Sequence, residues 1–151
     1  MWYFKGIEFN LSDYEKSFGF VYLITELNTG KMYIGQKQFW SKKIKVVKGN
    51  KKKVKCESDW QTYFSSSSYI QEEIKQGKID NFKREILILT TGKGQSNYLE
   101  AKLQMDCRVL ENPDIFLNGI INLRCSTGHL KLETVIDQDS DRINLLMRQS
   151  I

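Results

Sequence analysis

Residues 18–35 read FGFVYLITELNTGKMYIG, and the rest of the fold is predicted outward from them. Residues 18–25 are rich in aromatic and β-branched side chains, which favours a β-strand. Asn28 and Gly30 are residues that a tight turn prefers. Residues 32–35 then fit a returning strand. The stretch therefore predicts an antiparallel β-hairpin.

A further strand and two helices are expected after the hairpin. Residues 82–90 end in a continuous apolar run, which is typical of a central strand covered on both faces. A capping box starting at Ser68 predicts a helix over 69–76. A turn at 91–94 and an apolar stripe with helical spacing predict a second helix over 97–110.

Other segments carry weaker patterns. Residues 37–55 contain nine lysines and no acidic residue, and they predict a basic loop or a second hairpin turning at Gly49-Asn50. Residues 1–16 fit an arm or a short strand, and 115–123 fit a strand or loop. Leu132, Val135 and Ile136 recur at helical spacing, which predicts a terminal helix within 131–151.

The composition fits one globular domain. Of the 151 residues, 40% are hydrophobic and 12% aromatic, which is enough for a core and excludes wholesale disorder. We expect a single α+β domain over 1–151, in which helices flank a small antiparallel β-sheet made of the N-terminal hairpin and the central strand. The core is expected at about 18–125, a basic insert at 37–57 and a C-terminal tail at 126–151.

The charge and the cysteine content indicate the class of partner and the cellular compartment. The net charge of +5 suggests a polyanionic partner. No apolar run approaches the ~20 residues of a membrane span, so no membrane partner is expected. Cys56, Cys107 and Cys125 are odd in number and widely spaced, which indicates free thiols in a reducing compartment. A cytoplasmic location is therefore expected.

The hairpin carries a two-part motif. Gly19-Phe20-Val21-Tyr22 is followed ten residues later by Met32-Tyr33-Ile34-Gly35. The pair resembles the signature of the GIY-YIG nuclease family. The second half matches in Tyr33-Ile34-Gly35, whereas the first half has one inserted residue, so that Gly-Phe-Val-Tyr or Phe-Val-Tyr stands for Gly-Ile-Tyr. The resemblance covers about residues 18–125. It implies a metal-dependent enzyme that hydrolyses phosphodiester bonds in DNA.

Tyr22 and Tyr33 are the candidate catalytic residues of the hairpin. A suitable register of the paired strands puts both hydroxyls on one side of the sheet. A phosphodiesterase needs a proton acceptor, a cation for the phosphate and a metal to polarise it. A phenol has a pKa of ~10, so we expect neighbouring lysines and a metal to lower it. The alternative is that both tyrosines are core residues.

The sequence departs from the family where a phosphate-contacting arginine is implied after the second tyrosine. No arginine occurs between Tyr33 and Arg84. Lys43 is the first candidate replacement by spacing, and Arg84 on the later strand is the second. A lysine lacks the bidentate fork of arginine, so the replacement has chemical consequences.

The implied metal ligand is a lone carboxylate on the second helix, and Glu100 fits this position. A hard cation such as Mg²⁺ (or Mn²⁺) accepts one protein carboxylate together with waters and phosphate oxygens. The alternative is that Asn97 and Glu100 form a capping box at the start of the helix.

The family also carries an asparagine after this helix that braces the site. Asn118 has the better aromatic context and Asn122 has the better following residues. One of the two is expected to be a turn residue, and the sequence leaves the choice open.

Contacts with DNA are expected from the basic insert and from the segment after it. Residues 58–67 resemble a Trp-x-x-Tyr-x-x-Ser-Ser stretch of phage-type family members, although they fit a helix entrance equally well. The candidates for DNA contact are Lys37, Lys42, Lys45, Lys51, Lys52, Lys53, Trp60, Tyr63 and Ser66.

The sequence thus predicts a DNA endonuclease encoded by a phage or mobile element and acting in the host cell cytoplasm. The length leaves little room for a separate specificity domain, so a protein partner or a homo-oligomer is expected to supply specificity. One alternative is a non-catalytic nucleic-acid-binding module that keeps the nuclease fold, which the missing arginine supports. The other is a restriction-type nuclease with its specificity in the insert.

Overall fold

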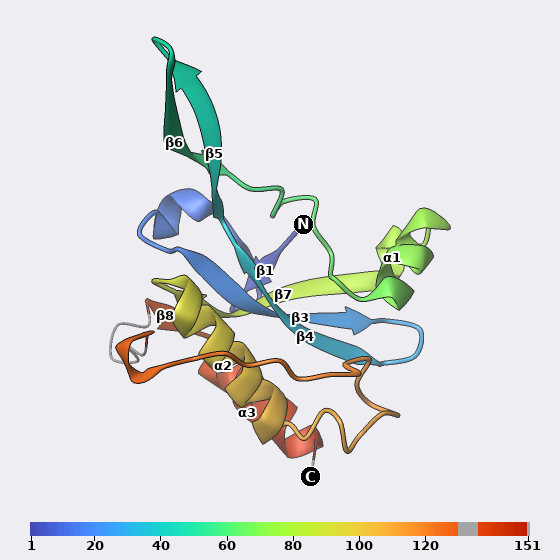
Figure 1. Ribbon diagram of the computed structural model, residues 1–151. Helices are drawn as coiled ribbons and strands as arrows, with labels where there is room; N and C mark the ends of the chain where they lie inside the picture. Colours follow the sequence, from blue (N-terminus) through green and yellow to red (C-terminus); the bar gives the residue numbers. More distant parts are fainter. Residues whose placement is uncertain (130–135, 151) are drawn as a thin grey trace.

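A mixed β-sheet forms the centre of the computed structural model, which describes residues 1–129 and 136–150 (Figure 1). Its strands lie in the order β2-β1-β7-β3-β4, with β8 paired to β7. They are β1 (Tyr3–Phe4), β2 (Ile7–Glu8), β3 (Gly19–Glu26), β4 (Met32–Gln38), β7 (Phe82–Thr90) and β8 (Asp137–Gln138). The α+β fold class is therefore confirmed.

The strands that carry the motif are those the sequence predicts. β3 and β4 form the expected hairpin, and β7 has the bounds predicted for the central strand. β7 lies between β1 and β3, and most of its residues are buried, which explains its continuous apolar run. One feature differs from an antiparallel sheet: β1, from the N-terminal arm, runs parallel to β7.

Both faces of the sheet are covered. Helices α2 (Lys93–Asp106) and α3 (Ser140–Gln149) pack on one face (Figure 1). The core there joins Val21, Leu23, Ile34 and Leu87 to Leu103 and Leu146. On the other face an aromatic cluster is formed by Trp2, Phe20, Tyr22, Phe39 and Trp60, with Ile70 from helix α1 (Ser68–Lys75). Short 3-10 helices occur among the described residues at Leu11–Tyr14, Ile79–Asn81 and Thr127–His129.

The basic insert is a second hairpin, as one of the two predictions had it. β5 (Trp40–Val47) and β6 (Asn50–Glu57) form a separate two-stranded sheet that projects from the rest of the molecule (Figure 1). Val47 pairs with Asn50, so the turn residues are Lys48 and Gly49 rather than Gly49 and Asn50. Both have positive φ, at 50° and 78°, as a two-residue hairpin turn requires.

The second helix begins four residues before its predicted start. Gly92 is the N-cap of α2, so the predicted turn at 91–94 and a cap at Asn97 are both wrong. Gln95 explains the early start, because its side-chain oxygen accepts from the Thr91 backbone N–H at 2.8 Å and so stabilises the first turn. The helix ends at Asp106 and not at 110, because Arg108 adopts a left-handed conformation with φ of 53°.

Smaller corrections concern α1 and the C-terminal tail. The N-cap of α1 is Ser67 and not Ser68, and its hydroxyl accepts from the backbone N–H of Ile70 at 3.5 Å. In the described part of the tail, helix α3 runs from Ser140 to Gln149 and is capped by Asp139. Leu132 and Val135, on which the terminal helix was predicted, lie outside the described residues. Within the part of the chain that is described, no helix is long and apolar enough to span a bilayer.

Candidate active site

The register of β3 and β4 puts the two motif tyrosines on the same face of the sheet, as expected. Tyr22 lies opposite Gly35, and Tyr33 lies opposite Ile24. Because side chains alternate between the two faces along a strand, these two pairs, which lie two residues apart along each strand, share a face. The ring centroids of Tyr22 and Tyr33 are 6.3 Å apart.

Gly35 leaves space for the ring of Tyr22. A Cβ atom at position 35 would lie 2.4 Å from the Tyr22 Oη and 2.5 Å from its Cζ, which is far inside van der Waals contact. The phenol therefore lies across the backbone of the facing strand. This contact gives a steric reason for pairing a tyrosine in the first half of the motif with a glycine in the second.

The two tyrosines have different surroundings. Tyr22 is buried, with an exposed fraction of 1%, and it packs edge-on against Tyr63. Tyr33 is half-buried, and its hydroxyl shares a 3.0 Å hydrogen bond with Ser66 Oγ. The ring of Tyr33 belongs to a residue that lines a surface pocket.

Burial raises the pKa of both phenols. Removal from water raises the pKa of Tyr22 well above its usual 10 and raises that of Tyr33 to a smaller degree, with the Ser66 hydrogen bond acting in the opposite direction. The expected lowering of these pKa values by lysines is therefore not found. Tyr33 is a neutral phenol at pH 7, able to donate and to accept a hydrogen bond.

A pocket of about 490 Å³ lies between the edge strand β4, helix α2 and the segment 120–124. It brings together four of the predicted site residues from four parts of the chain. They are Tyr33 on β4, Ser66 before α1, Glu100 on α2 and Asn122. Gln36, Asn97, Gln104, Ile120, Leu123 and Arg124 complete its lining.

Glu100 does not act as a helix cap. It lies in the second turn of α2, because the helix begins at Lys93, so the capping-box alternative is wrong. Burial raises the pKa of its carboxyl to about 7, and the Gln104 side chain donates to it at 3.5 Å. It forms no ion pair with another described residue.

A partly buried carboxylate without a cationic partner fits a divalent cation. No cluster of three His, Cys, Asp or Glu side chains exists among the residues described, so a metal here would rely on Glu100 as its charged protein ligand. Mg²⁺ accepts such sparse protein coordination, because it keeps several waters and takes substrate oxygens as ligands. Asn97 and Asn122 line the same pocket, and an amide oxygen is a ligand type that a hard cation prefers.

The cation in this pocket is Arg124, which the sequence interpretation missed. Arg124 is exposed and lines the pocket that contains Glu100 and Tyr33. The residues predicted for phosphate binding, Lys43 and Arg84, both lie earlier in the chain. The available signal was the closeness of Arg124 to the candidate Asn122, two residues earlier.

The two residues predicted for the cation role lie elsewhere. Lys43 is exposed on the projecting strand β5 and is not among the residues that line the pocket. Arg84 is buried on β7 and donates from Nη1 to the backbone carbonyls of Gln61 and Tyr63, at 2.9 and 2.8 Å. Its guanidinium therefore holds the segment that carries Tyr63.

Asn118 and Asn122 occupy distinct places. Asn118 is buried, and its side chain accepts from the N–H of Ile34 at 2.9 Å and donates to the C=O of Ile34 at 2.8 Å. Ile34 belongs to the edge strand β4, so Asn118 fastens the segment after α2 to the sheet. Asn122, four residues further on, lies in the pocket.

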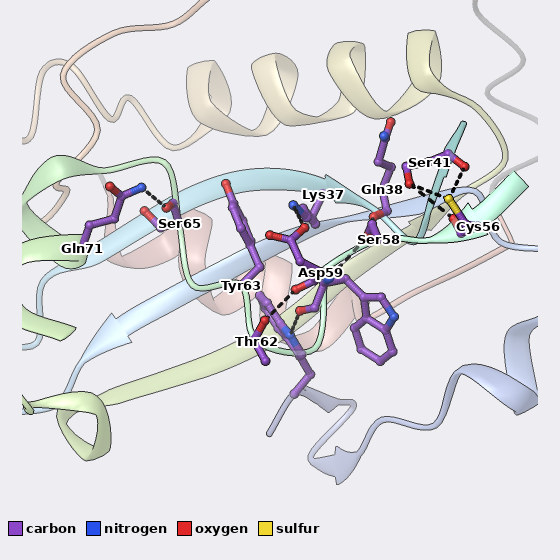
Figure 2. Close-up of polar contacts among 12 residues, drawn as sticks. Lys37, Gln38, Ser41, Cys56, Ser58, Asp59, Thr62, Tyr63, Ser65 and Gln71 are labelled. Atoms are coloured by element: carbon purple, nitrogen blue, oxygen red, sulfur yellow. Dashed lines mark hydrogen bonds and ion pairs between the residues drawn. The ribbon is translucent and has the colours of Figure 1, made fainter. Parts of the chain in front are cut away.

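The segment 58–67 crosses the aromatic face of the sheet (Figure 2). Near its end, Ser66 lines the pocket. Trp60, a predicted DNA contact, is 5% exposed and packs in the aromatic cluster, so the structure places it in the core. Lys37 is also a predicted DNA contact. Its Nζ forms a 2.6 Å ion pair with Asp59 and lies 3.9 Å from the centroid of the Tyr63 ring. Lys42, Lys45, Lys51, Lys52 and Lys53 lie exposed on the projecting hairpin.

Comparison with known protein families gives a match. The family model described as "Putative endonuclease segE, GIY-YIG domain" matches residues 2–121. No curated protein and no solved structure matched the chain.

Proposed function

Because this chain belongs to the GIY-YIG nuclease family, we propose that it is a divalent-metal-dependent endonuclease that hydrolyses phosphodiester bonds in DNA. The observation that carries the proposal is the pocket that joins Glu100, Arg124 and Tyr33. A carboxylate, a guanidinium and a phenol are the groups needed to hold a cation, contact a phosphate and orient a water molecule.

In this proposal Glu100 holds Mg²⁺ or Mn²⁺, with waters and substrate oxygens as the remaining ligands. The bound cation would polarise the scissile phosphate and neutralise charge that develops on it. Arg124 contacts a non-bridging phosphate oxygen, for which its planar fork is well suited. Asn122, beside them, can donate a hydrogen bond to a phosphate oxygen.

Tyr33 orients the attacking water through its hydroxyl, which Ser66 holds in place. Tyr22 acts as a positioning residue, because its buried ring packs against Tyr33 and spans the backbone at Gly35. Asn118 is a second positioning residue: its two bonds to Ile34 fix the start of the segment that leads to Asn122 and Arg124.

The origin and setting of the enzyme remain part of the proposal. We infer a phage or mobile-element origin and action in the host cytoplasm, and these rest on the sequence arguments above. The non-catalytic alternative rested on the absence of an arginine after Tyr33. Arg124 in the pocket removes that support.

A nicking assay on supercoiled plasmid tests the proposal. The full chain should convert supercoiled DNA to nicked and linear forms with Mg²⁺ or Mn²⁺, and a chelator should abolish the reaction. Absence of cleavage with every divalent metal tried, in a folded protein that binds the plasmid, would favour the non-catalytic module instead.

A further inference from the structure

The hairpin of β5 and β6 is an unsupported ribbon with an unusual charge pattern. Its strands pair with each other and form a sheet of their own. Such an isolated hairpin is marginally stable in water. Lys42 lies opposite Lys55, and Lys45 lies opposite Lys52. Like charges directly opposite each other destabilise a ladder. The repulsion between these paired lysines therefore makes the hairpin less stable.

The register divides the ribbon into two faces, because side chains alternate along each strand. One face, called the groove face here, carries Lys42, Ile44, Val46, Lys51, Lys53 and Lys55. The opposite face, called the back face, carries Lys43, Lys45, Val47, Lys52 and Val54. Both faces are basic, so the same number of lysines can be removed from either face. An experiment can therefore distinguish the effect of total charge from the effect of which face meets the partner.

The groove face combines positive charge with exposed apolar side chains. Ile44 and Val46 are 64% and 68% exposed. None of the groove-face lysines forms an ion pair within the described chain. The major groove of DNA offers the matching chemistry, because phosphates line its edges and thymine methyl groups lie on its floor. It is ~12 Å wide and admits a two-stranded ribbon.

The groove face continues into a pocket at the base of the hairpin. This pocket, of about 690 Å³, is lined by Lys16, Lys42, Lys55 and Lys93, with Trp40 among them and Glu15 as its acidic member. Lysines from three parts of the chain therefore meet where the ribbon joins the body. This basic surface lies between the hairpin and the first turn of α2.

Helix α2 sets the distance between this basic pocket and the candidate active site. Lys93 and Glu100 are seven residues apart on the same helix, which corresponds to ~10 Å along its axis. The rise of B-DNA is ~3.4 Å per step, so this distance is about three base pairs. A duplex with its cleaved phosphate at Glu100 would reach the base of the hairpin about three base pairs to one side.

We propose that the β5–β6 hairpin enters the major groove of duplex DNA through its groove face and contacts base edges on one side of the cleavage site. This inference rests on the proposed nuclease function and narrows its substrate to double-stranded DNA. Lys51 and Lys53 contact phosphates at the groove edges, and Ile44 and Val46 contact base edges.

Binding of a labelled duplex by the full chain, in chelator, tests the orientation of the ribbon. The groove-face variant combines Lys51→Ser with Lys53→Ser, and the matched back-face variant combines Lys45→Ser with Lys52→Ser. Both remove two charges from the same exposed hairpin. The groove-face variant should bind duplex roughly tenfold weaker, and its salt slope should fall by ~1.8, since each phosphate contact contributes ~0.9. The back-face variant should stay within about twofold of the parent.

Several results would overturn the proposal. Equal losses in the two variants would mean that charge acts without orientation. Tighter binding of the single strand than of the duplex would exclude groove docking. Unchanged duplex affinity in both variants would show that the hairpin does not bind DNA and would favour another partner, such as an acidic protein.

Base contact is tested separately by selecting binding sites from a randomised duplex, again in chelator. Ile44→Ser should change the selected bases, whereas Val47→Ser on the back face should not. Identical selected sequences for the parent and Ile44→Ser would show that the ribbon does not contact bases. Both measurements report binding without cleavage, so their failure is distinct from the failure of the nuclease proposal in the nicking assay.

Discussion

At the scale of single residues, the motif is explained by the contact between Tyr22 and Gly35. The tyrosine ring lies across the glycine backbone on the facing strand, so each residue restricts the other. The same reasoning applies at Gly19, where a Cβ would lie 2.5 Å from the Lys37 carbonyl oxygen. A pattern of sequence letters thus corresponds to steric complementarity across the two strands of one hairpin.

Gly35→Ala should destabilise the protein. The added methyl must displace the buried Tyr22 ring, and overpacking of this kind costs about 1–3 kcal/mol. Urea unfolding measures the loss. Gly119→Ala is the control, because a Cβ there meets nothing within 4 Å, and it should change stability little. Equal stability of the parent and Gly35→Ala would contradict the packing described here.

Substitutions of Arg124 and Lys43 are expected to have different effects on the nicking rate. Arg124→Ala should lower the nicking rate at saturating DNA by on the order of 10²–10³, as loss of a charge-stabilising group does. Lys43→Ala, on the projecting hairpin, should nick at nearly the parent rate. If only Lys43→Ala lowers the nicking rate, then Lys43 contacts the phosphate and Arg124 does not.

At the scale of elements, the sequence predicted the regular parts better than the irregular ones. The bounds of β7 and the presence of the hairpin follow from apolar and β-branched runs, whereas β4 extends three residues beyond the predicted end at Gly35. The start of α2 was missed because Gly92 and Gly94 resemble a turn, whereas Gln95 closes the first helical turn there. Arg124 lies in a segment without periodicity. Its place follows from the bonds of Asn118 to Ile34, which no local pattern reveals.

Arg84 should act through the segment 58–67 and not on the phosphate. Arg84→Met keeps much of the stem but leaves the carbonyls of Gln61 and Tyr63 without their donor. Each such unsatisfied group costs about 1–3 kcal/mol. We expect a clear loss of stability, measured by thermal melting, and substantial nicking activity well below the melting temperature. A phosphate clamp would give the reverse, with unchanged melting and a lost rate.

At the scale of the whole molecule, the titration of Glu100 links pH to stability. Its carboxyl has a pKa of about 7 in the folded chain, against an ordinary 4.5. The folded state therefore binds this proton more tightly than the unfolded state. The stability that the group contributes is complete below the ordinary pKa and is lost as pH rises through about 7.

A divalent cation should compete with this proton. The increase in melting temperature caused by Mg²⁺ should therefore be larger at pH 8 than at pH 6, since the carboxylate is free to bind metal only when deprotonated. Differential scanning fluorimetry at the two pH values measures the shift. Glu100→Gln should show little shift at either pH. A shift that persists in Glu100→Gln would place the metal elsewhere.

The most direct test of the active-site pocket is the nicking rate of Glu100→Gln. The amide keeps the size of the side chain but has no charge to hold a hard dication. We predict a variant that melts within a few degrees of the parent, binds DNA at least as tightly, and loses nearly all nicking even at high Mg²⁺. Parent-level nicking by a well-folded Glu100→Gln protein would contradict the assignment of Glu100 as the metal ligand.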